Sequence, residues 1–171
     1  MLKEACCEGF TEGINAEALG ANRIELCSNL AVGGLSPSFN EVKEALKFLN
    51  IPVFVMVRPR EWNFIYTKKE KELMIQEIRN LKNIKVEGIV IGSLNNKGEI
   101  DTEFMKEVVK IAGTLFFSFL ISFNTSKPFL FGTLTSKSRR SKVSSYIFVI
   151  ASSPSYTQIT SKPSSSKYSA T

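Results

Sequence analysis

The chain has 171 residues, of which 43% are hydrophobic and 22% charged, so it holds enough apolar material for the core of one domain. It has no histidine, which excludes histidine metal sites and Ser-His-Asp triads, and its three cysteines are too few for a disulfide scaffold. Residues 1–107 carry 14 Lys and Arg and all 16 Asp and Glu, whereas residues 108–171 carry 8 Lys and Arg and no acid. This break predicts two regions, 1–113 and 114–171.

The first region alternates short apolar strands with capped helices. In chain order, the expected strands are residues 2–7, 23–27, 51–58 and 86–91. The first helix is expected at 10–19, and Ser38, Thr67 and Asp101 are the expected N-caps of the other three. Four βα units in a row predict an α/β fold with a parallel sheet and right-handed crossovers.

The second region loses this alternation. Residues 114–123 and 143–151 are apolar runs far shorter than the roughly 20 residues of a membrane helix, so we expect no membrane span. The first run can add a substitute fifth strand to the sheet. Residues 124–171 have neither caps nor apolar periodicity, which predicts disorder. The basic cluster 137–142 is interpreted as an accident of this segment, with no nucleic-acid partner.

One face of the expected sheet carries charge and sulfur, because side chains alternate across a strand. Five of these residues lie on the first two strands and one ends the third: Glu4, Cys6, Arg23, Glu25, Cys27 and Arg58. Charges that face an interior must pair, and α/β folds place their sites at the carboxyl ends of parallel strands. The spacing therefore suits a functional site and a buried layer of ion pairs equally well.

The two thiols on this face are the sharper feature. Neighbouring strands lie about 4.8 Å apart, which allows Cys6 and Cys27 to approach each other. Two soft thiolates without histidine suit Cu(I) better than Zn(II), which takes four ligands. The alternative, which spacing alone favours, is a pair of ordinary buried cysteines. Cys7 alternates to the helix side and is expected to pack there.

Two features near the strand ends suit an anion. Arg58 and Arg60 flank a proline, and their guanidinium groups match a carboxylate or phosphate. The backbone N–H groups of Gly33 and Gly34 precede the second helix and can also bind an anion. The alternatives are surface charge on a turn and a flexible βα loop.

Taken together, these segments resemble the CutC copper-homeostasis family. The resemblance is carried by EAC at 4–6, RIELCS at 23–28, GGLSP at 33–37, IPVFVMVRPR at 51–60 and GEID at 98–101, through about residue 113. It implies a TIM (β/α)8 barrel, of which residues 1–113 would be the N-terminal half. It also implies Cu(I) binding through Cys6 and Cys27. The polar cluster of the barrel mouth would then be Glu4, Arg23, Glu25, Arg58 and Arg60.

The chain departs from this family after Gly113. The Thr-Phe-His-Arg signature of the fifth family strand is absent, so we interpret residues 114–171 as a Ser-, Lys- and Phe-rich tail from a retained intron or a frameshift. We expect a copper homeostasis homologue, cytoplasmic and also nuclear, whose Cu(I) binding is impaired by truncation, with no assigned reaction. The alternatives are a remnant of a barrel enzyme that binds a small anionic substrate, and a non-functional product. Open sheet edges predict a homo-oligomer.

Overall fold

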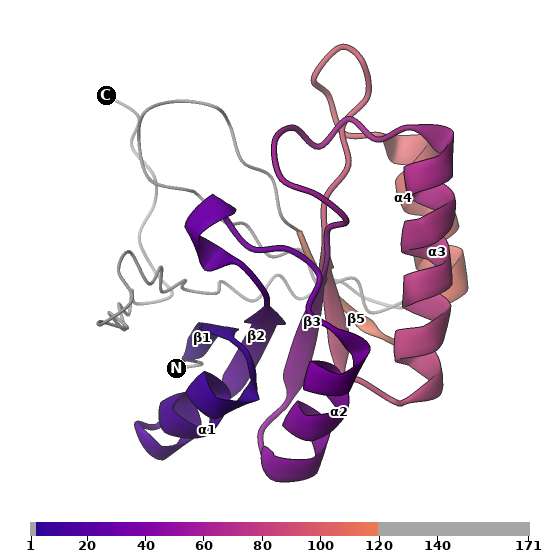
Figure 1. Cartoon of the computed structure of the whole chain (residues 1–171). Helices are drawn as coiled ribbons and strands as arrows, with labels where there is room; N and C mark the ends of the chain where they lie inside the picture. The colour runs from indigo at the N-terminus through magenta and orange to yellow at the C-terminus, as the bar shows by residue number, and fades with distance from the viewer. Residues whose placement is uncertain (1–2, 120–171) are drawn as a thin grey trace, which may run out of the picture.

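Five parallel strands form the centre of the fold in the computed structural model, which describes residues 3–119 (Figure 1). They are β1 (Glu4–Glu8), β2 (Arg23–Cys27), β3 (Val53–Val57), β4 (Gly88–Ile91) and β5 (Phe116–Phe119), and each pairs with the next along the chain. The helices are α1 (Phe10–Ala18), α2 (Phe39–Phe48), α3 (Lys68–Asn83) and α4 (Thr102–Ala112), with a short 3-10 turn, η1 (Leu30–Val32), after β2. The predicted α/β fold with a parallel sheet is confirmed.

The three predicted caps begin their helices as expected. The Ser38 side chain accepts from the Glu41 N–H at 3.2 Å, and Asp101 accepts from Phe104 at 3.2 Å. Thr67 forms a full capping box, because the Glu70 carboxylate also accepts from the Thr67 N–H at 2.6 Å. These local hydrogen bonds satisfy N–H groups that the helix itself leaves without partners.

The first, third and fourth predicted strands differ in their boundaries, whereas β2 has the predicted ones. β1 ends at Glu8 rather than at residue 7, and β4 begins at Gly88 rather than at residue 86. The third strand runs from Val53 to Val57 rather than over 51–58, since Pro52 has no N–H and contributes only its carbonyl, which accepts from Ile24 at 2.9 Å. The apolar run 114–123 supplies β5, which pairs in parallel with β4. The described fold is therefore four βα units followed by one more strand.

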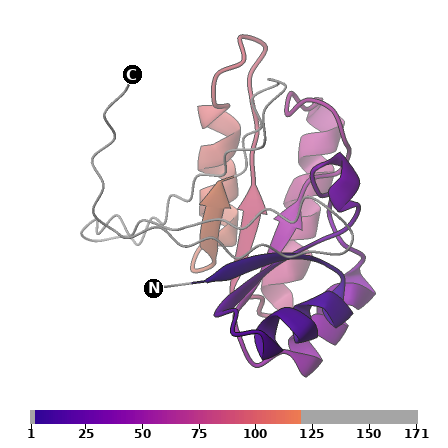
Figure 2. The same ribbon diagram turned by 90° about the vertical axis from the view of Figure 1, so that its left-hand side faces the viewer.

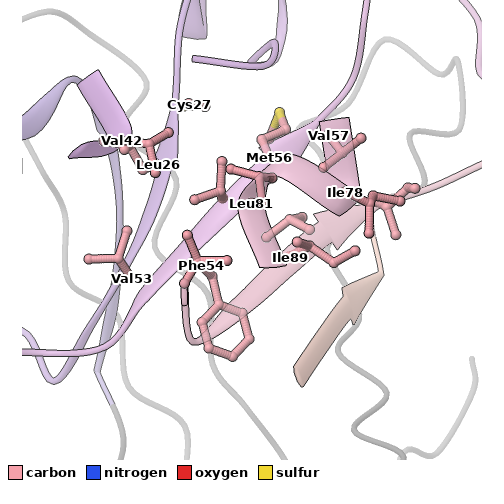
Figure 3. Packing of buried hydrophobic residues seen from close by; sticks show 14 of the residues in the cluster. Leu26, Cys27, Val42, Val53, Phe54, Met56, Val57, Ile78, Leu81 and Ile89 are labelled. Atoms are coloured by element: carbon pink, nitrogen blue, oxygen red, sulfur yellow. The ribbon is translucent and has the colours of Figure 1, made fainter. Parts of the chain in front are cut away.

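The helices cover one face of the sheet, and the hydrophobic core lies between them (Figures 2 and 3). Ile24, Leu26, Val55 and Ile89 are fully buried there from the strands, against helix residues that include Ile78. Each such side chain stabilises the fold by roughly 1.5–3 kcal/mol relative to exposure. The charged residues and the thiols therefore lie on the opposite face of the sheet, which we call the inner face.

Several predictions fall outside the described residues. These concern Leu2, the apolar run 143–151, the basic cluster 137–142 and the predicted disorder of 124–171. Among the described strands, β1 pairs only with β2 and β5 only with β4, and the expected self-association stays a prediction. Within residues 3–119, no helix has both the length and the apolar character needed to cross a bilayer.

Candidate functional site

The register of β1 against β2 aligns the inner-face residues. Glu4 is level with Arg23, and Cys6 is level with Glu25. Level residues on neighbouring parallel strands point to the same side, and side chains alternate along each strand. Cys27 therefore shares this face as well, and it is level with Glu8.

The two candidate thiols are diagonal neighbours rather than directly opposite each other. Cys27 lies one inner-face position beyond Glu25, which stands beside Cys6. Diagonal neighbours in a sheet have Cα atoms about 7–8 Å apart. The charge of Cys27 is among the causes that raise the pKa of Cys6, so the two thiols lie near each other. The Cys27 thiol donates to the Cys7 carbonyl at 3.5 Å, which directs the sulfur toward β1. Both cysteines are free.

Burial keeps the thiols protonated. It raises the pKa of Cys6 well above the usual value, and the Glu25 carboxylate raises it further. The same two causes, in the same order, raise the pKa of Cys27. Cys7 faces the helices, as expected, and lies in the hydrophobic core, where burial raises its pKa to about 12. A metal that binds Cys6 and Cys27 must therefore displace their protons.

The charged residues of the inner face form an ion pair that also packs on an aromatic ring. Arg23 donates through Nε to the Glu4 carboxylate, and both side chains are buried. The Arg23 guanidinium also lies 4.1 Å from the ring centroid of Phe54. Burial raises the pKa of the neighbouring Glu25 to about 8, with the Glu4 charge as a second cause. Glu25 is thus largely protonated at neutral pH, which avoids a second buried negative charge beside Glu4.

Arg58 clamps the loop between β2 and α2. Its Nη1 donates to the carbonyls of Val32, Gly33 and Gly34 at 3.2, 3.1 and 2.9 Å. Its Nη2 donates to the Trp62 carbonyl at 3.2 Å. The guanidinium of Arg58 therefore joins two loops at the carboxyl end of the sheet.

The other residues predicted to bind an anion also make hydrogen bonds within the protein. Arg60 donates to Glu70 at 2.5 Å and to the carbonyl of Ile65 at 2.8 Å. Gly33 and Gly34 donate their N–H groups to carbonyls within their own loop. An anion would have to replace these contacts, so they favour the structural alternative for all four residues.

Two groups near this end of the sheet were missed by sequence reasoning. Ser36 accepts from the Arg58 N–H at 2.9 Å and donates to the Glu77 carboxylate at 3.0 Å, which ties α3 to the clamped loop. Met56 lies beside Cys27 on the inner face, where strand alternation with Phe54 places it, but its thioether was not among the predicted metal ligands. Among residues 3–119, no three His, Cys, Asp or Glu side chains are placed to hold a metal ion together.

Comparison with known proteins identifies related chains. The family model described as "CutC family" matches residues 1–129, beyond the predicted boundary at Gly113, which stays a prediction. A CutC family protein of Enterococcus faecalis is 39% identical over 127 residues, which cover 72% of this chain and 61% of that protein. The copper homeostasis protein cutC homolog of Homo sapiens is 40% identical over 114 residues, which cover 67% of this chain and 42% of that protein.

A comparison of folds finds a protein of the same family. The crystal structure of a CutC protein from Streptococcus agalactiae superposes with a TM-score of 0.66 at 35% identity, over 70% of this chain and 58% of that one. The chain thus spans about half the length of the proteins that it matches. The comparison supports the predicted TIM-like architecture.

Proposed function

The chain belongs to the CutC family, and we propose that it is a copper homeostasis protein that binds Cu(I) through Cys6 and Cys27. A human relative carries the name copper homeostasis protein, which supports the copper link. In this proposal copper is the ion that the protein binds and passes on, not a resident cofactor. The expected impairment of Cu(I) binding by truncation stays a prediction.

The observation that carries this proposal is the placement of two free thiols on the inner face. Cys6 and Cys27 come from neighbouring strands, point to the same side and lie on a diagonal. Cu(I) is a soft ion that prefers thiolate and thioether sulfur and is satisfied by few ligands, whereas Zn(II) takes four. Two sulfurs without a wider cluster of His, Cys, Asp or Glu in the described part of the chain fit the first ion better.

The same thiols support a proposal about the compartment. Free cysteines persist where glutathione and thioredoxin keep them reduced. We therefore propose that this function is carried out in the cytosol.

A competition titration tests the proposal. The full chain, reduced and free of oxygen, is titrated against a coloured Cu(I) chelator, and the Cys6→Ser and Cys27→Ser variants are compared with Cys7→Ser. We expect each of the first two to lose on the order of a hundredfold in affinity, because a hydroxyl is a poor ligand for a soft ion. Cys7→Ser should bind as the unmodified chain does. Equal affinity of all four proteins would show the proposal to be wrong.

A further inference from the structure

A third sulfur atom lies at the same end of the sheet as the two thiols. Leu26 of β2 is level with Val55 of β3, so the next residue of each strand, Cys27 and Met56, stand beside each other. Both are 1% exposed. Figure 3 shows them near each other at one end of the buried cluster, with the Met56 sulfur in yellow.

The loop above the sheet shows how close these two side chains come. A Cβ built on Gly34 would lie 2.9 Å from the Met56 sulfur and 3.4 Å from the Cys27 Cβ. Both side chains therefore contact the same point of the loop. Glycine at this position, with φ at +82°, lets the backbone lie close to the end of the Met56 side chain, both its sulfur and its terminal methyl group.

We infer that Met56 is a third sulfur ligand of the Cu(I) site formed by Cys6 and Cys27. The inference rests on the proposed function and extends it by one residue. Methionine has an unbranched, flexible side chain, so its sulfur can move toward Cys27 without a change in the backbone. A thioether is a good ligand for Cu(I) and is not among the usual ligands of Zn(II).

Charge also favours a thioether in this place. Two thiolates and one Cu(I) leave a net charge of about −1, and the site adjoins the buried carboxyl of Glu25. A third thiolate would add another buried negative charge, whereas the neutral methionine sulfur adds a ligand without one. Three-coordinate sulfur binding is therefore reached at the lowest electrostatic cost.

Methyl NMR of the full chain, labelled with ¹³C at the methionine methyl groups, tests this inference. Cu(I) is added to one equivalent, and the Met56 signal is assigned by its absence in Met56→Leu. We expect the Met56 methyl signal to shift, while that of Met74, fully buried on α3, stays in place. In the competition titration, Met56→Leu should lose on the order of tenfold in affinity and Met74→Leu none. Leucine conserves the side-chain volume in both variants.

The outcomes separate this inference from the proposed function. A Met56 methyl signal that does not move, with equal affinity of Met56→Leu and the unmodified chain, overturns the third ligand alone when Cys6→Ser and Cys27→Ser still lose binding. Failure of the unmodified chain to bind Cu(I) overturns both. A shift at Met56 together with the loss of affinity supports the three-sulfur site.

Discussion

Arg58 donates to the carbonyl of Gly34 at 2.9 Å and thereby holds a loop that is 24 residues earlier in the sequence. Gly34 in turn lies against Met56 and Cys27. The end of β3 therefore fixes the segment that covers the proposed sulfur site.

Replacing Arg58 with Lys should loosen this cover. An ammonium group keeps the charge but cannot donate to three successive carbonyls in the fixed geometry of a guanidinium. In a chain whose only cysteine is Cys27, we expect labelling by a thiol reagent to accelerate roughly tenfold, the effect of an opening free energy lower by about 1.4 kcal/mol. Arg60→Lys, which affects the neighbouring loop, is the control. Identical labelling rates for the two variants would contradict the clamp.

Gly34→Ala should destabilise the fold more than Gly98→Ala. Both glycines have positive φ, +82° and +78°, so both substitutions carry a backbone cost of about 1–2 kcal/mol. A Cβ at Gly34 would come within 2.8 Å of Met56, whereas nothing lies within 4 Å of one at Gly98. We expect an additional loss of about 1–3 kcal/mol for Gly34→Ala in urea unfolding. Equal losses would refute the close approach of the loop to Met56.

Arg23→Ala should be strongly destabilising. It leaves the buried Glu4 carboxylate without its ion pair, a change that costs about 3–5 kcal/mol at buried sites. The loss is measured as the free energy of unfolding in urea, with the exposed Arg79→Ala on α3 as a control that should change it by less than about 0.5 kcal/mol. Similar values for the two variants would mean that the Glu4–Arg23 pair contributes little.

Glu77 makes stability depend on pH. Burial raises its pKa from 4.5 to about 7, although the hydrogen bond from Ser36 lowers it in part. The folded chain thus holds the proton more tightly than the unfolded one, so this contribution is full below pH 4.5 and is lost as pH rises through about 7. The Glu77→Gln variant has no titrating group at this position, so its stability does not fall in this way as the pH rises.

The difference in unfolding free energy between Glu77→Gln and the unmodified chain measures that loss. Relative to the unmodified chain, the variant should gain about 1–3 kcal/mol between pH 4 and pH 8. Other titrating groups are common to both proteins and cancel in the difference. A difference that does not change with pH would contradict the raised pKa of Glu77.

The fold was predictable where the signals are local. The N-caps Ser38, Thr67 and Asp101 satisfy N–H groups only three residues away, and the strands carry contiguous apolar residues. The right-handed crossover rule then orders the strands along the sheet. The start of β3 was less predictable, because Pro52 has no N–H and contributes only its carbonyl to the pairing with β2.

The sequence predicts which residues of the candidate site share one face of the sheet, but not how they are aligned with one another. Alternation assigns Cys6, Glu25 and Cys27 to the same side, since it depends only on the two-residue period of a strand. The register that makes Cys6 level with Glu25 rather than Cys27 depends on pairing between segments about 20 residues apart, which no local pattern specifies. The clamp by Arg58 has the same origin, a contact between distant loops.

X-ray absorption at the copper edge of the Cu(I)-loaded chain identifies the atoms that bind the ion. We expect a first shell made of sulfur alone in the unmodified chain and in Cys7→Ser, and loss of that shell in the double variant Cys6→Ser with Cys27→Ser. A shell of oxygen or nitrogen atoms, or an unchanged sulfur shell in the double variant, would contradict this expectation.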